Sequence, residues 1–278
     1  MIKHFLWSAV AALAITLPNY ASAGTVVFDN DFTAAEGFTD GPLALQNGFV
    51  SQAMFSVTNS AGTGEVVATT PNFNRFTEDG NLFDFTTLAV GDMVILDLFS
   101  LSGSTGTNNQ LGVLGFTTLT TADGENPGGQ ANSQLGGQLT SNGTNYFIDS
   151  SAFAVSGSAI DTGIALGTAI DYQVKVTSAG GGLFDVLQTV QLAGGGGAVT
   201  RLDTGVADAG NGNFVAPGTA NLDNNVAAIF QTQNNNVSNV SIGGFRGEIK
   251  LAAIPEPSSL GLLGLGLAGL LSRRRRKS

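Results

Sequence analysis

Asp92–Leu101 reads DMVILDLFSL and carries the clearest structural pattern in the chain. Val94, Leu96 and Leu98 occupy every second position, so they would lie on one face of an extended strand. Between Gly24 and Leu251 no long stretch shows the 3.6-residue period of an amphipathic helix. The pattern therefore predicts an all-β protein.

Similar apolar runs recur along the chain and are separated by turns rich in Gly, Asn, Asp and Ser, with Gly at 39 of 278 residues. The runs predicted as strands are Thr25–Phe28, Ala53–Thr58, Glu65–Thr70, Leu82–Thr86, Asp92–Leu101, Leu111–Thr120, Thr144–Ile148, Ala169–Thr177, Leu183–Leu192, Ala198–Leu202, Val226–Thr232, Val237–Ile242 and Gly247–Ile254. Closely spaced strands without intervening helices favour a β-sandwich or jelly roll over βαβ units. We expect one such domain over residues 24–252.

Composition excludes several functions for the region between the two termini. Residues 24–254 hold all 21 acidic residues except Glu256 and only five of the 11 basic residues, which gives a formal net charge of −15. Nucleic acid is not expected as a partner, because binding it needs a positive surface. The chain has no Cys, and its single His is His4. Ser-His-Asp and Cys-His catalysis and the usual zinc sites are therefore excluded.

Residues 1–23 have the three parts of a secretory signal peptide. Lys3 supplies a basic start, Phe5 to Leu17 forms an apolar core, and Ala21 and Ala23 provide a small-x-small cleavage site. We expect a signal helix that the general secretion machinery removes, so that the mature chain begins near Gly24.

The C-terminus also has three parts. Pro255, Glu256 and Pro257 come first, the apolar run Leu260–Leu271 follows, and the basic cluster is Arg273, Arg274, Arg275, Arg276 and Lys277. We expect a transmembrane helix at about residues 258–271, with the basic end on the cytoplasmic side. The run is shorter than the ~20 residues of a permanent span, which favours a transient anchor.

This tail closely resembles the PEP-CTERM sorting signal of Gram-negative bacteria. The resemblance implies that an exosortase processes the chain, which is exported, held transiently in the inner membrane, cleaved near Pro-Glu-Pro and passed to the cell surface or extracellular matrix. The alternative is an ordinary C-terminal membrane anchor.

A second resemblance concerns the domain itself. Phe38–Leu43, followed by Gln46–Phe49, is similar to the opening of concanavalin A-like jelly-roll domains, although Phe49 stands where that family usually has Trp. The resemblance implies a β-sandwich in which Ile242–Ile249 belongs to a final strand that pairs with the first.

Asp29 and Asp31 are candidate metal ligands after the first strand. They share a strand face, and carboxylate oxygens suit Ca²⁺. The alternative is a turn held by Asx hydrogen bonds. We expect Glu78–Asn81 to be a turn and Asn221–Asn225 to be a weaker Ca²⁺ candidate.

Catalysis is not expected. A glycoside hydrolase needs two carboxylates at one cleft, and the nearest pair, Asp92 and Asp97, is spaced to face opposite sides of a strand. We interpret both as strand-edge residues. Aromatic residues that could stack on a sugar are Tyr146, Phe147, Tyr172 and Phe214, with burial in the core as the alternative for each.

These observations predict an exported surface or matrix protein with a non-catalytic, lectin-like or structural role in the exopolysaccharide matrix. The alternative is a polysaccharide-acting glycoside hydrolase that uses a carboxylate pair.

Overall fold

The computed structural model describes residues 24–51, 55–60, 63–68, 74–104, 109–118, 135–149, 158–207, 226–232 and 238–252. These residues form 17 β-strands and two short 3-10 helices, Ala34–Glu36 and Phe85–Thr87, without any α-helix among them. Ala23–Leu251 is one compact unit. None of the described helices is long and apolar enough to cross a membrane. The predicted signal peptide and transmembrane helix lie outside the described residues.

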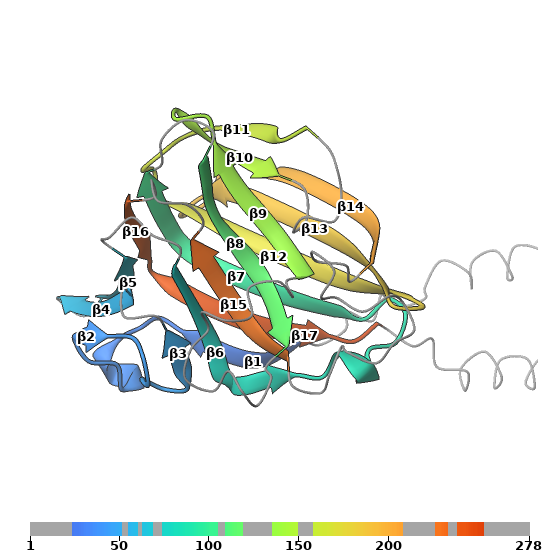
Figure 1. Cartoon of the computed structure of the whole chain (residues 1–278), viewed down its shortest axis with the longest axis horizontal. Coiled ribbons are helices and arrows are strands. Elements are labelled where there is room, and N and C mark those ends of the chain that lie inside the picture. Colours follow the sequence, from blue (N-terminus) through green and yellow to red (C-terminus); the bar gives the residue numbers. More distant parts are fainter. Residues whose placement is uncertain are drawn as a thin grey trace, which may run out of the picture. The chain divides into compact units, whose positions relative to one another are not determined.

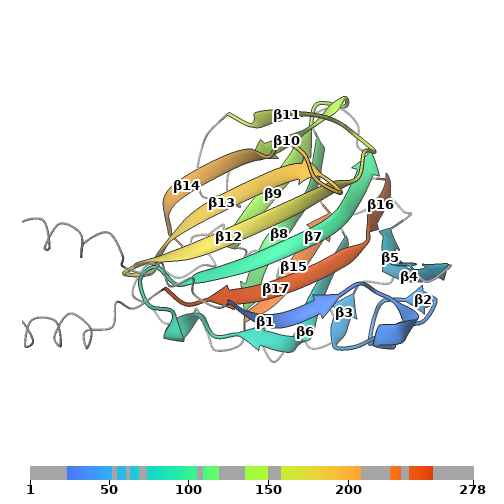
Figure 2. The ribbon, with the colours of Figure 1, turned by 180° about the vertical axis from the view of Figure 1, so that it is seen from behind.

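The strands build two antiparallel sheets that stack face to face (Figures 1 and 2). The ten-stranded sheet has the order β14 (Val199–Ala207), β13 (Leu183–Leu192), β12 (Ile170–Gly180), β7 (Met93–Ser104), β16 (Ser238–Ile242), β5 (Thr63–Ala68), β4 (Phe55–Ser60) and β2 (Gly41–Pro42), with β17 (Gly244–Lys250) beside β7 and β1 (Gly24–Asn30) beside β17. The seven-stranded sheet has the order β11 (Ile160–Ala165), β10 (Asn145–Asp149), β9 (Leu135–Ser141), β8 (Asn109–Thr118), β15 (Val226–Thr232), β6 (Asn74–Phe83) and β3 (Phe49–Ser51). The predicted all-β sandwich is confirmed.

The core fills the space between the sheets. In β12 the buried residues Tyr172, Val174 and Val176 alternate with partly exposed ones, as expected when one face of a strand packs inward. Phenylalanine dominates the centre, where Phe76 and Phe245, from opposite sheets, meet edge to face with ring centroids 5.6 Å apart. Each such side chain stabilises the fold by about 1.5–3 kcal/mol when fully buried.

β7 is the central strand of the larger sheet and has two partners along one edge. Its first part pairs with β17 and its last part with β16, and Gly243 lies between these two partners. β17 in turn pairs with β1, in a register that sets Lys250 opposite Gly24. The final strand thus pairs with the first.

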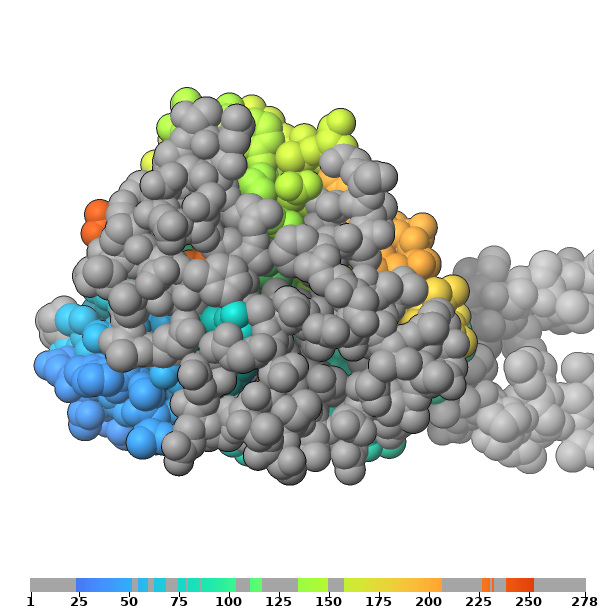
Figure 3. Space-filling model, in the orientation of Figure 1, coloured from blue at the N-terminus to red at the C-terminus, as the bar shows by residue number. Residues whose placement is uncertain are grey.

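The space-filling view looks at the molecule from the side of the smaller sheet. Described residues of β10 and β11, in green, lie at one end of it, and the N-terminal strands, in blue, lie at the other (Figure 3).

Several strand predictions need correction. Leu82–Thr86 is not one strand, because β6 ends at Phe83 and a 3-10 helix follows. Glu78–Asn81, predicted to be a turn, lies within β6, and Glu78 is fully buried there. β9 and β11 were not predicted. β9 reads LGGQLTS, and its two adjacent glycines interrupt the alternation that identifies a strand.

Candidate functional site

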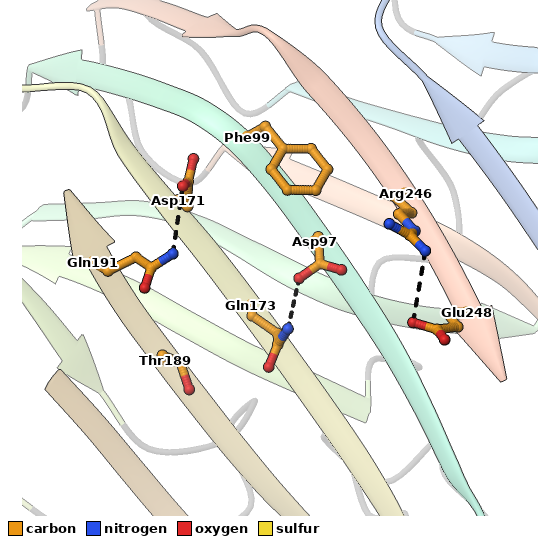
Figure 4. Close-up of a pocket in the computed structure, with 8 residues that line it drawn as sticks. All are labelled: Asp97, Phe99, Asp171, Gln173, Thr189, Gln191, Arg246 and Glu248. Atoms are coloured by element: carbon orange, nitrogen blue, oxygen red, sulfur yellow. Dashed lines mark hydrogen bonds and ion pairs between the residues drawn. The ribbon is translucent and has the colours of Figure 1, made fainter. Parts of the chain in front are cut away.

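A pocket opens on the face of the ten-stranded sheet that is turned away from the core. The strands of this sheet lie toward the viewer in Figure 2. Its volume is about 370 Å³, which falls in the ~300–1,000 Å³ range of ligand sites. Each of four neighbouring strands contributes two residues separated by one inward-facing residue (Figure 4). The lining residues are Thr189 and Gln191 from β13, Asp171 and Gln173 from β12, Asp97 and Phe99 from β7, and Arg246 and Glu248 from β17.

The antiparallel register aligns several of these side chains in one row across the sheet. Thr189 is opposite Gln173, Gln173 is opposite Asp97, and Asp97 is opposite Arg246. Beyond the pocket, Arg246 is opposite Asp29 of β1. Because directly opposed side chains in a sheet lie within reach of one another, this row forms a continuous polar surface.

Asp97 lies at the centre of the row. Gln173 Nε2 donates a hydrogen bond of 2.8 Å to Asp97 Oδ1. Burial raises the pKa of Asp97 above its ordinary value and the Glu248 carboxylate raises it further, while the Gln173 hydrogen bond and the positive charges of Arg246 and Lys250 oppose the shift. The net direction means that the sheet holds this carboxylate in a poorly solvated position.

Asp171 is oriented by neutral donors as well. The Ser100 backbone N–H donates to Asp171 Oδ1 at 3.1 Å, and Gln191 Nε2 lies 3.5 Å from Asp171 Oδ2. Amide groups therefore fix both aspartates of the pocket without neutralising their charge.

Arg246 lies among carboxylates on the β17 side. Its Nε is 3.9 Å from Asp29 Oδ2, and its Nη2 is 3.9 Å from Glu248 Oε2. Lys250 Nζ is 3.4 Å from the same Glu248 oxygen. The Nε atom of Arg246 is buried and has no hydrogen-bond partner among the described residues.

Phe99 is the aromatic residue of the pocket, and its ring lies among the polar side chains (Figure 4). The opposite residue on β17 is Gly244. A Cβ atom at position 244 would lie 3.1 Å from Phe99 Cδ2 and 3.2 Å from Asp31 Oδ1. Glycine at this position therefore leaves the edge of the ring uncovered.

The predicted Ca²⁺ ligands lie beside this pocket. Asp29 is near the end of β1 and contacts Arg246, as described above. Asp31 follows the strand, and its backbone N–H donates to the Glu36 carboxylate at 3.0 Å. Partial burial raises the pKa of Asp31, and the negative charges of Glu36 and Asp29 add to the effect. The described residues contain no group of three or more His, Cys, Asp or Glu placed to hold a metal ion. Calcium binding by Asp29 and Asp31 stays a prediction.

The predicted sugar-stacking tyrosines belong to the core instead. Tyr146 and Tyr172 are both fully buried. The Tyr172 hydroxyl donates to Gln188 Oε1 at 2.7 Å, and the Tyr146 hydroxyl donates to the Thr168 carbonyl at 3.0 Å. Burial raises the pKa of both phenols. Phe147 is only partly buried, whereas Phe214 and the Asn221–Asn225 segment lie outside the described residues.

The interpretation of Asp92 and Asp97 as strand-edge residues is wrong for Asp97. Asp92 is buried, and its Oδ2 accepts the Ala89 N–H at 2.8 Å in the turn before β7. Asp97 lies in the middle of a strand that has neighbours on both sides. It is close to the carboxylate of Glu248, which comes from another strand, so spacing within one strand could not reveal this pair.

A sequence signal for the pocket does exist. Each lining strand carries a residue pair at positions i and i+2 on its outward face, with an apolar or small residue between the two. Such pairs occur on any strand with one solvated face, and their convergence depends on the strand order, which the sequence does not state.

Solved structures show the class of fold. The chain resembles peanut lectin in complex with a nine-residue peptide, with a TM-score of 0.50, 11% identity, and coverage of 84% of this chain and 100% of the lectin. It also resembles a carbohydrate esterase from Shiga toxin-encoding bacteriophage phi24B, with a TM-score of 0.50, 12% identity, and coverage of 82% and 100%. At these identities the likeness establishes a lectin-like, concanavalin A-like β-sandwich. No curated protein sequence is significantly similar to this chain.

The C-terminal segment gives more specific information than the fold does. Residues 253–277 match the PEP-CTERM protein-sorting motif, which confirms the resemblance based on Pro255, Glu256, Pro257 and the arginine cluster. The motif indicates an exported protein that an exosortase sorts. These residues lie outside the described part of the structure.

Proposed function

We propose that this protein is a non-catalytic, lectin-like component of the extracellular polysaccharide matrix, which it reaches after exosortase processing at the inner membrane. In this proposal the pocket formed by β13, β12, β7 and β17 binds the polysaccharide. The observation that carries the proposal is the convergence of eight outward-facing residues on one open sheet face.

The chemistry of the lining suits a sugar. Carboxylates accept hydrogen bonds from hydroxyl groups, and the amides of Gln173 and Gln191 both donate and accept them. The Phe99 ring, which no side chain of residue 244 covers, offers an apolar surface for the C–H groups of a sugar ring. The pocket spans three strand-to-strand intervals, about 14 Å, so a polymer can lie across it without a chain end.

A second candidate function is hydrolysis of the polysaccharide. The observation that favours it is the position of Asp97 diagonally across from Glu248 on β17, because a carboxyl group with a raised pKa near a second carboxyl group resembles a general acid near its partner. Esterase and lectin share this fold among the solved structures, so the fold alone favours neither function.

The first experiment is co-sedimentation of the domain with exopolysaccharide from the producing bacterium, combined with an assay for released sugar. Phe99→Ala should weaken binding roughly tenfold, whereas Leu202→Ala, an exposed residue of β14 outside the pocket, should leave it unchanged. Binding without sugar release supports the lectin-like role, and release that Asp97→Asn abolishes supports the hydrolase.

Two further outcomes decide the remaining points. Absence of both binding and release would overturn the proposal in favour of a purely structural matrix protein. Loss of binding when a chelator removes Ca²⁺, with recovery on its return, would support a metal at Asp29 and Asp31. Binding that is unaffected by the chelator would count against that site.

A further inference from the structure

The charges in the pocket are unbalanced. Among the eight lining residues, the carboxylates are Asp97, Asp171 and Glu248, and the only cation is Arg246. The formal charge of the lining is therefore −2. Arg246 cannot attract an anionic ligand effectively, because Asp29 and Glu248 already lie 3.9 Å from its guanidinium nitrogens.

The two aspartates differ from Glu248 in their partners. Glu248 has Arg246 and Lys250 within ion-pair distance. Neither Asp97 nor Asp171 forms an ion pair with any described residue, and both accept hydrogen bonds from neutral amide groups. Their carboxylates are thus held in place while their negative charge remains available to a ligand.

A cation in the pocket would relieve an unfavourable state of the free protein. Burial already opposes the charge on Asp97, as the raised pKa of this carboxyl shows. A cationic ligand would supply the missing positive charge, whereas an anionic ligand would add repulsion in a partly dehydrated site.

We infer that the polysaccharide bound by this pocket carries protonated amino groups, which Asp97 and Asp171 receive next to the Phe99 ring. This inference rests on the proposed function, because it specifies the ligand of the same pocket. It assigns the carboxylates to recognition of an amino-sugar polymer and predicts discrimination against polymers of uronic acids.

The test compares three probes by isothermal titration of the purified domain. Oligomers of glucosamine are cationic, the fully N-acetylated oligomers of equal length are neutral, and oligouronates are anionic. The glucosamine oligomers should bind at least about tenfold more tightly than their acetylated counterparts, and the oligouronates should not bind.

Variants separate specific recognition from general attraction to an acidic protein. Asp97→Asn and Asp171→Asn keep the side-chain shape and should each weaken binding of glucosamine oligomers by about tenfold. Asp185→Asn makes the same change in charge on the same sheet, outside the pocket, and should have little effect.

The outcomes distinguish this inference from the proposed function. Equal loss of binding in Asp97→Asn and Asp185→Asn would overturn the inference by showing non-specific attraction. Equal or tighter binding of the acetylated oligomers would also overturn it, yet would leave polysaccharide binding by the pocket intact. If no glycan of any charge binds, the proposed function fails together with the inference.

Discussion

The carboxylate of Asp97 lines the pocket in a partly buried position. Burial disfavours its charged form, and this opposes folding. Its strand neighbours Leu96 and Leu98 are fully buried in the core, and its own side chain points outward into a crowded row where water has limited access. Proteins commonly keep such unfavourable groups where binding requires them.

The pH dependence of stability should reveal this cost. Because the folded-state pKa of Asp97 is raised, its protonated form is favoured by folding, and the protein loses stability as pH rises from about 3.9 through the folded-state value. Asp97→Asn mimics the protonated form and should raise the melting temperature by about 2 °C at pH 7. This gain should disappear near pH 3, as differential scanning calorimetry at both pH values would show. A gain that persists at acid pH would contradict the explanation.

β9 illustrates how one element depends on a contact between the sheets. Gly136 is opposite Gly115 of β8, and this pair allows the two backbones to approach closely. Gly137 leaves space for the buried group formed by the Tyr172 hydroxyl and the Gln188 amide. Gln188 Oε1 also accepts the Gln138 N–H at 2.9 Å, so the polar group joins β9 to the opposite sheet.

Adding a single methyl group at Gly137 should disturb this contact between β9 and the opposite sheet. In Gly137→Ala the new Cβ would collide with the Tyr172 hydroxyl and the Gln188 side chain, and we expect a loss of about 1–3 kcal/mol in the free energy of unfolding. Gly197→Ala is the matched control, since nothing lies within 4 Å of its added Cβ. Urea denaturation of both variants measures the difference. Similar stability of the two variants would show that β9 moves freely to accommodate the methyl group.

Sequence patterns were sufficient for strands that form one uninterrupted alternating or apolar run. β13 and β15 have the predicted bounds, because β13 keeps its alternation of buried and partly exposed residues and β15 contains the continuous apolar run 227–230. The patterns failed for β9, because its two adjacent glycines are required by contacts with residues distant in the sequence and do not themselves favour a strand. For the same reason the pocket was missed. Asp97 and Glu248 become neighbours only through the pairing of β7 with β17, which no local rule supplies.

At the scale of the whole molecule, two parts of the chain have separate tasks. The sandwich ends with β17 at Lys250, and the PEP-CTERM motif begins at residue 253. The separation of only a few residues places the sorting signal directly after the last strand. Changes in the motif should therefore alter the fate of the protein without altering the fold.

Replacement of Pro255, Glu256 and Pro257 by alanine should keep most of the protein in the cell-membrane fraction, because the exosortase would lose its recognition sequence. Cell fractionation followed by immunoblotting measures the ratio of membrane-bound to released protein. Alanine at Ser258 and Ser259 is the control and should permit normal release. Unchanged release of the Pro-Glu-Pro variant would show that the motif is dispensable for sorting.

The pairing of β1 with β17 imposes an order of events on export. Gly24 and Lys250 are opposite each other, so the first strand of the exported chain has its partner only when nearly the whole domain has followed. Contacts between such distant segments form slowly. The chain must therefore cross the membrane before its sheet can close, and by then the sorting motif is the next segment to arrive. Completion of the fold and arrival of the sorting motif should therefore nearly coincide.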